Sequence, residues 1–179
     1  MDASAVAVIG TAVGTIGGLG GSWLSMLGQS RQHRQQARDE RERWREEIRR
    51  EAYNTFIATA KQLSAAWWRA ADQLWEEGSG PDDWQARFLE AHAAWAQFST
   101  AAAAVSVAGP SDVADAADDL RKAMSEWEMV GTAWSHAAIR GGQGRLDDFD
   151  VRFKAAAEAK RAPDRAFQQA ARKALGTDT

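Results

Sequence analysis

The chain has 179 residues, 25 acidic and 22 basic side chains, and a formal net charge of −3, so no global charge excess indicates nucleic acid or an acidic surface as a partner. It contains no cysteine, which excludes disulfide frameworks and thiolate metal sites. The composition is rich in the helix formers Ala, Glu, Arg and Gln, and no run of residues alternates as a strand does. The sequence therefore predicts an all-α fold.

The first feature along the chain is an uncharged apolar stretch, residues 3–28, in which small residues recur at every fourth position. Its helical length of roughly 39 Å is enough to cross the hydrocarbon core of a bilayer. Small residues at this spacing let helices approach closely in lipid. Residues 1–28 are therefore predicted to form a transmembrane helix that also drives homo-oligomer formation. The predicted self-association residues are Gly10, Gly14, Gly17, Gly18, Gly21 and Ser22.

The residues that flank this stretch predict its orientation. Trp23 lies near its carboxyl end, where tryptophan favours the membrane interface, and Arg31, Arg34 and Arg38 follow with no acidic residue among them. Arginines at this position favour the cytoplasmic side and contact anionic lipid. We therefore expect a single-pass protein of the inner (cytoplasmic) membrane, with its amino terminus outside and its carboxyl-terminal domain in the cytoplasm.

The amino-terminal stretch also allows two other interpretations. A cleaved signal peptide is disfavoured, because its first residues, Met1 and Asp2, are acidic rather than basic and the apolar run is too long. A helix buried in the shared core of a soluble homo-oligomer remains open, because the glycines lower the hydrophobicity of the segment.

Residues 29–43 have almost no apolar side chains and are predicted to form a charged helical stalk. Asp39 and Arg43 have the i, i+4 spacing that stabilises an exposed helix, and so do Glu46 and Arg50 just beyond. Acidic residues interrupt the arginines, and no aromatic ladder accompanies them. A nucleic-acid interface is therefore unlikely.

Residues 44–179 are predicted to form an antiparallel four-helix bundle with long helices. Apolar residues recur at steps of three and four from Trp44 onward, and Gly-rich or Gly-Pro breaks separate the runs. The predicted helices cover about 44–77, 82–108, 111–139 and 145–175, with a kink or break at Pro163. Pro81 is expected in the first turn of the second helix. Short connections favour up-down-up-down neighbours.

Large aromatic side chains on the inner stripes face many alanines, which is how a bundle interior is filled. An aromatic ligand or lipid pocket is the alternative explanation for nine tryptophans. Trp68 and Trp75 fall on neighbouring faces of the first helix, where partial exposure is expected. The predicted core residues are Trp67, Trp84, Phe88, Trp95, Phe98, Leu120, Trp127, Trp134 and Phe153.

The sequence offers no recognisable catalytic or cofactor site. The three histidines, His33, His92 and His136, are far apart, and none has a partner at a metal-binding helical spacing. The acidic cluster at residues 147–150 lacks the ligand pattern of a calcium loop and suits the start of a helix. We therefore predict a protein that is not an enzyme and needs no metal or cofactor.

The order of parts resembles a type of small membrane-anchored helical protein of actinobacteria. The segment VIGTAVGTIGGLGGSWL is Gly-rich and apolar, and GQSRQHRQQARDERERWREEIRREAYNTFIATAKQL, a Gln/Arg-rich helix, follows it before a helical domain. The resemblance covers roughly the first 65 residues. It implies a membrane-associated protein and assigns a role to no residue.

These observations favour a non-enzymatic, self-associating scaffold that is anchored in the membrane and presents a cytoplasmic bundle to a protein partner. One alternative is a membrane-permeabilising, pore-forming or holin-like effector that uses the glycine strip. A second is a soluble homo-oligomeric assembly protein whose amino-terminal helices pack together.

Overall fold

The computed structural model describes the backbone of residues 4–177 and the side chains of residues 38 and 40–177. Every element is a helix: α1 (Ser4–Trp75), α2 (Pro81–Ala108), α3 (Ser111–Gly141), α4 (Asp147–Ala159) and α5 (Arg161–Ala174). The chain divides into two compact units, residues 1–45 and 46–179. The predicted self-association residues, Gly10, Gly14, Gly17, Gly18, Gly21 and Ser22, lie outside the residues whose side chains are described, as do Trp23, Arg31 and Arg34.

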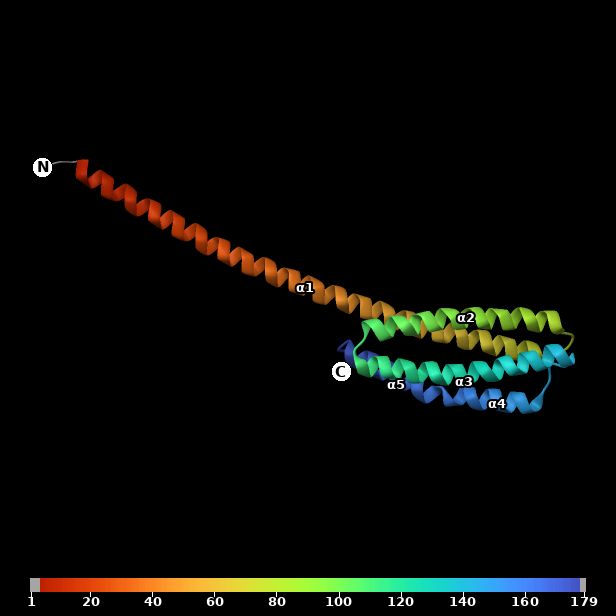
Figure 1. Ribbon diagram of the computed structural model, residues 1–179. Helices are drawn as coiled ribbons and strands as arrows, with labels where there is room; N and C mark the ends of the chain where they lie inside the picture. The colour runs from red at the N-terminus through yellow and green to blue at the C-terminus, as the bar shows by residue number, and fades with distance from the viewer. Residues whose placement is uncertain (1–3, 178–179) are drawn as a thin grey trace. The chain divides into compact units, whose positions relative to one another are not determined.

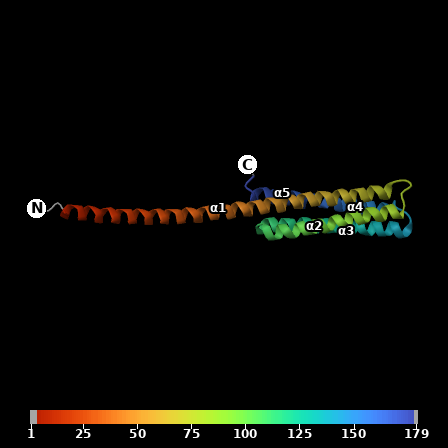
Figure 2. The same ribbon diagram turned by 90° about the horizontal axis from the view of Figure 1, so that it is seen from above.

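The second unit is a bundle of four helical layers, with α4 and α5 together forming the fourth (Figure 1). Helix α3 packs against α2 and against α4 and α5, and α1 packs against its neighbours through an aromatic and alanine stripe (Figures 1 and 2). Short turns join consecutive layers, so neighbouring layers in the chain run antiparallel. The predicted all-α bundle is confirmed.

The part of α1 that faces the bundle begins later than the sequence predicts. Trp44 is predicted to start the apolar stripe, but its side chain is 63% exposed, and Ala52 is the first buried residue among the described side chains of α1. Helix α2 ends at Ala108 and its C-cap, Gly109, lies beside Tyr53. Residues of α2 therefore cover the apolar stripe of α1 only from about Tyr53 onward. The apolar periodicity of α1 does not reveal where the neighbouring helix ends.

The turn from α1 to α2 contains the helix-breaking residues that the sequence indicates. Gly78 adopts φ +85°, a backbone conformation that favours glycine. Pro81 occupies the first turn of α2, as predicted, where its missing N–H costs nothing. The backbone N–H of Gly80 donates to Asp83 Oδ2 at 3.1 Å, so the acidic side chain closes the start of the helix.

At the opposite end of the bundle, residues 109–110 join α2 to α3. The Arg49 Nε donates to the Ala108 carbonyl at 3.2 Å. A guanidinium at this position satisfies a terminal carbonyl of α2 and complements the negative end of the helix dipole. The contact also fixes the carboxyl end of α2 to α1.

The predicted fourth helix is divided at Lys160, three residues before Pro163. Helix α5 starts at Arg161, so Pro163 falls in its first turn. The N–H groups of a first turn have no intrahelical acceptor, so a proline is tolerated there. The helix therefore breaks before the proline and not at it. The sequence predicts the break correctly but places it at the wrong residue.

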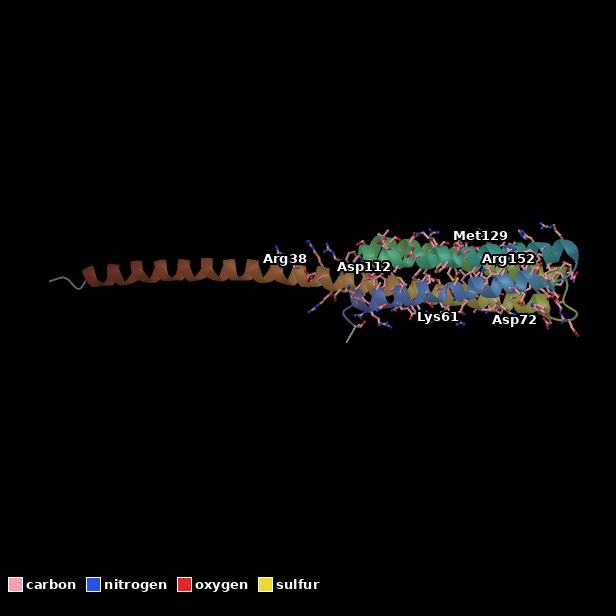
Figure 3. All side chains as sticks on the ribbon, turned by 90° about the horizontal axis from the view of Figure 1, so that it is seen from below. Arg38, Lys61, Asp72, Asp112, Met129 and Arg152 are labelled. Carbon is pink, nitrogen blue, oxygen red and sulfur yellow. The ribbon has the colours of Figure 1, made fainter. Side chains whose placement is uncertain are left out.

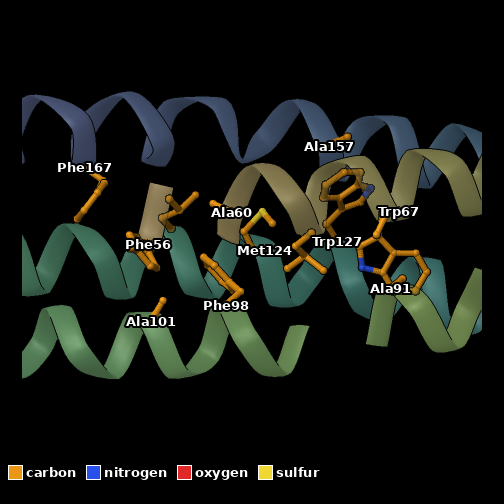
Figure 4. Close-up of a cluster of buried hydrophobic side chains, with 14 of the residues drawn as sticks. Phe56, Ala60, Trp67, Ala91, Phe98, Ala101, Met124, Trp127, Ala157 and Phe167 are labelled. Atoms are coloured by element: carbon orange, nitrogen blue, oxygen red, sulfur yellow. The ribbon is translucent and has the colours of Figure 1, made fainter. Parts of the chain in front are cut away.

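Buried side chains form one continuous core along the bundle, and the close-up in Figure 4 shows part of it. Of the predicted core residues, Phe88 and Trp95 are half-buried and pack against the core from α2. The other seven, Trp67, Trp84, Phe98, Leu120, Trp127, Trp134 and Phe153, are buried.

Candidate functional site

The aromatic residues near the α1–α2 turn fill the bundle interior. Phe153 of α4 contacts four indoles edge-on or tilted, with centroid distances of 6.5 Å to Trp67, 5.4 Å to Trp68, 5.1 Å to Trp127 and 5.7 Å to Trp134. Gly131 of α3 makes room for one of these rings: a Cβ there would lie 2.5 Å from Trp67 Cζ3. These tryptophans therefore pack against one another and against a glycine, the arrangement expected of core residues.

Two indoles, those of Trp84 and Trp134, donate hydrogen bonds to the connecting turns. Trp84 Nε1 donates to Ser79 Oγ at 2.8 Å and to the Gln73 carbonyl at 3.2 Å, which closes the carboxyl end of α1. Trp134 Nε1 donates to the Gly144 carbonyl at 2.9 Å. Each indole thus buries its ring and satisfies a backbone carbonyl, which holds both turns against the bundle.

An open groove with a volume of about 470 Å³ lies between α1 and α4. Two tryptophans of α1 form its aromatic wall, of which Trp68 is 40% exposed and Trp75 is half-buried. Its polar lining has three carboxylates and one ammonium. We call this surface the tryptophan groove and define it by Trp68, Ala71, Asp72, Trp75, Glu76, Asp150 and Lys154.

The tryptophan groove carries more negative than positive charge. Lys154 Nζ lies 2.8 Å from Asp150 Oδ2, so the single cation of the groove is already paired. Asp72 lies at the outer surface of α1 (Figure 3), and Glu76 is exposed just beyond the end of that helix. The negative end of the α1 dipole adds to these carboxylates. The groove therefore combines aromatic faces with a net negative potential.

Arg145, which is not one of the lining residues, shows how an indole of this region binds a guanidinium. Arg145 places its Cζ 5.6 Å from the centroid of the Trp75 ring and donates from Nη2 to the Trp75 carbonyl at 3.0 Å. A cation over an indole face is stabilised by the ring quadrupole. The same chemistry is available to a cation that approaches Trp68.

Two ionisable groups away from the groove are shifted by burial. Glu128 of α3 is buried, and burial raises its pKa above the ordinary value although His92, whose Nδ1 lies 3.5 Å from Glu128 Oε1, opposes the shift. Burial also lowers the pKa of Lys160, whose Nζ donates to Ser64 Oγ at 3.0 Å. Both groups lie between helices, where water is partly excluded.

The remaining predicted site residues are placed as follows. Arg38 is exposed. Among the residues that the structure describes, no helix has the length and apolarity that a membrane span requires, and no group of three metal-ligating side chains comes together. The predicted membrane anchor lies almost wholly outside the described side chains, so it stays a prediction.

Comparisons with protein-family models, with curated proteins and with solved structures find no match for this chain. The resemblance to actinobacterial membrane-anchored proteins therefore stays a prediction.

Sequence reasoning missed three features of the surface. It did not associate Asp150 with Trp68, because the two lie on different helices. It did not single out Glu128, because a lone Glu in a helix is usually solvated. It did not pair Ser64 with Lys160, which are 96 positions apart. The spacing of Trp68, Asp72 and Trp75, at steps of four and three on one helix face, is the only signal that pointed toward the groove.

Proposed function

We propose that this protein is a non-enzymatic scaffold whose helical bundle binds a basic segment of a protein partner through the tryptophan groove. The observation that supports the proposal is the pairing of two accessible indoles, Trp68 and Trp75, with three carboxylates in one hollow. Tryptophan is a frequent anchor at protein interfaces, and opposite charge directs the encounter.

The lining of the groove determines which side chains the partner segment must carry. It carries an arginine or lysine to lie over the Trp68 indole and to meet Asp72 and Glu76, and an apolar side chain to lie beside the half-buried Trp75 ring. Arginine suits both needs, because its guanidinium stacks on an aromatic face while it donates to a carboxylate. The arrangement of Arg145 on Trp75 provides an intramolecular example of this contact.

The amino-terminal part of the proposal comes from the sequence. Residues 1–28 anchor the protein in the inner membrane and associate with the same segment of other copies, so that several bundles are presented together in the cytoplasm. Presenting several weak sites on one assembly raises the apparent affinity for a partner that is itself multivalent.

The groove is tested by calorimetric titration of the full chain with a synthetic peptide of alternating Arg and Leu, and with its Glu and Leu counterpart. We expect the Arg peptide to bind, the Glu peptide not to bind, and Trp68→Ala to weaken binding about tenfold or more, the loss typical of an interface anchor. Trp44→Ala is the matched control, because Trp44 is exposed but lies outside the groove. Equal binding by both variants would exclude the groove.

The anchor is tested by fractionation of cells that express the full chain with a carboxyl-terminal tag. Protein that resists carbonate and leaves the membrane in mild detergent as one large species supports a self-associating anchor, and Gly14→Leu with Gly18→Leu should reduce its size. Protein in the soluble fraction supports the soluble assembly instead. Loss of membrane potential on expression supports the pore-forming alternative.

A further inference from the structure

A second and smaller cleft lies where the fourth layer of the bundle is broken. It has a volume of about 160 Å³ and lies between α1, α3 and the start of α5. Its apolar lining comes from α1 and α3, and its polar lining from α1 and the residues around the break. The lining residues are Ile57, Ala60, Lys61, Ser64, Leu120, Met124, Lys160 and Asp164.

The helix break directs Lys160 into this cleft. Lys160 is the single residue between α4 and α5, and its side chain reaches across to α1, where Nζ donates to Ser64 Oγ at 3.0 Å. The same nitrogen lies 5.3 Å from the centroid of the buried Trp127 ring. The amine is thus held at a fixed position, against one hydroxyl and one aromatic face.

The surroundings of this amine favour its neutral, nucleophilic form, whereas those of Lys122 favour the ammonium. Burial lowers the pKa of Lys160, and the nearby Arg161 adds to this effect, whereas Asp164 opposes it. Lys61 of α1 adds a second cation to the cleft, and α3 contributes the apolar Leu120 and Met124. In contrast, hydrogen bonds from Lys122 to Asp118 and Asp119 raise the pKa of Lys122.

The cleft also limits what can reach the amine. Its volume of about 160 Å³ is about a third of the 470 Å³ of the tryptophan groove, so it suits a small occupant. Leu120 and Met124 provide an apolar surface for an alkyl chain, and the ammonium of Lys61 disfavours a cation. The cleft therefore fits a short aliphatic molecule with one polar end.

We propose that Lys160 is a covalent attachment site for short aliphatic aldehydes, which it binds as an imine. This inference is independent of the proposed partner groove. Ser64 Oγ, which donates its own proton to the Ala60 carbonyl at 2.7 Å, orients the amine by accepting from it. The Asp164 carboxylate, held by a 3.0 Å hydrogen bond from Gln168 Nε2, lines the same cleft and takes the proton that the ammonium loses.

The reaction needs no oxidant or reductant. The Nζ lone pair attacks the carbonyl carbon, the C–N bond forms, and the C=O electron pair moves to oxygen, which gains a proton. The C–O bond of this carbinolamine then breaks, nitrogen loses its remaining extra proton, and one water leaves as the C=N bond forms. The product is an imine that hydrolysis reverses.

The experiment treats the full chain with limiting butanal and sodium cyanoborohydride, which reduces the imine to a stable secondary amine, and maps the label by peptide mass spectrometry. The chain has five lysines, Lys61, Lys122, Lys154, Lys160 and Lys173, so every side-chain amine is followed. We expect Lys160 to be alkylated first and Lys160→Arg to lose the first label. Lys61→Arg, which changes the other amine of the cleft, should keep it.

A second aldehyde separates the cleft from general amine reactivity. Naphthaldehyde has two fused rings and exceeds the cleft, so it should label Lys160 no faster than the other lysines. The proposal is overturned if butanal labels the five lysines at equal rates, or if naphthaldehyde shows the same preference for Lys160 as butanal. Far-UV circular dichroism of each variant establishes that it is folded.

Discussion

The two halves of the bundle interior are built from different aromatic residues. Near the α1–α2 turn, Trp67, Trp127 and Trp134 surround Phe153. Toward the other end the rings are smaller: Phe56 stacks on Phe98 at 5.0 Å, and Phe167 packs edge-on against Phe56 and Tyr53 (Figure 4). We call these parts the tryptophan half and the phenylalanine half.

This difference shows which side chains hold the turns against the core in each half. In the tryptophan half, Trp84 and Trp134 both fill space and donate to the carbonyls of the turns, whereas the buried Nε1 atoms of Trp67 and Trp127 have no hydrogen-bond partner among the described residues. In the phenylalanine half no described ring makes such a bond, since the buried hydroxyl of Tyr53 has no partner, and an arginine, Arg49, satisfies the terminal carbonyl of α2 instead. The tryptophan half therefore couples its turns to its core, and the phenylalanine half relies on a side chain nearer the surface.

The largest effect should come from Phe153→Ala in the tryptophan half. Loss of a buried phenyl ring that contacts four tryptophans leaves a cavity that rigid indoles cannot close, so the free energy of unfolding should fall by about 4 kcal/mol. Urea denaturation of the full chain, followed by circular dichroism, measures it. Phe56→Ala is the counterpart in the phenylalanine half and should cost less, about 3 kcal/mol. The reverse order would contradict the comparison.

The next effect concerns the glycine that the tryptophan half requires. Gly131→Ala places a methyl group 2.5 Å from the Trp67 ring, so the free energy of unfolding should fall by about 2 kcal/mol. Gly141→Ala, on the same helix with open space around its Cβ position, should leave stability unchanged or slightly higher. The same urea titrations test both variants, and equal losses would show that the ring does not cause the effect.

A smaller effect should follow from Trp84→Phe. The phenyl ring keeps most of the apolar contact but loses the donor to Ser79 Oγ and to the Gln73 carbonyl, so stability should fall by about 1 kcal/mol. Trp95→Phe, at a half-buried position of the same helix, is the control and should change stability less. If the two variants lose the same stability, the hydrogen bonds of the Trp84 indole do not hold the turn.

The smallest effect should be that of Glu128→Gln, and it depends on pH. Because burial raises the pKa of Glu128 in the folded protein, the folded state binds more protons than the unfolded state at pH values above 4.5, and stability falls as pH rises through the folded pKa. Glu128→Gln removes this loss, so it should stabilise the protein at pH 8 by up to about 1 kcal/mol and have little effect at pH 4. Thermal melts at the two pH values measure it, and a gain at pH 4 alone would contradict the assignment.

The sequence predicts the helices of the bundle closely, because the residues that end helices are local. Gly78, Pro81 and Pro110 divide α1, α2 and α3 near the predicted limits. The displaced break at Lys160 was not predicted, since a proline in a first turn does not show how far upstream the previous helix stops. The exposure of Trp44 was not predicted either, because it depends on where a different helix ends.

The candidate sites were less predictable than the fold. The tryptophan groove needs Asp150 and Lys154 beside Trp68, and only the packing of α4 on α1 brings them together. Trp68 and Trp75 themselves were expected to be partly exposed, as they are. The pKa shifts of Glu128 and Lys160 arise from burial by neighbouring helices, which no local pattern encodes.

The short turns of the bundle also have a consequence for how the protein folds. Each helix packs next to the one that follows it in the chain, so most loops that must close during folding are short, and bundles of this kind fold in microseconds to milliseconds. The fourth layer joins residues that are still farther apart in sequence than those joined by the other layers, as when Lys160 meets Ser64 of α1, 96 positions away. Docking of α4 and α5 onto α1 is therefore the step with the greatest entropic cost, and the two proposed sites are completed only in that step.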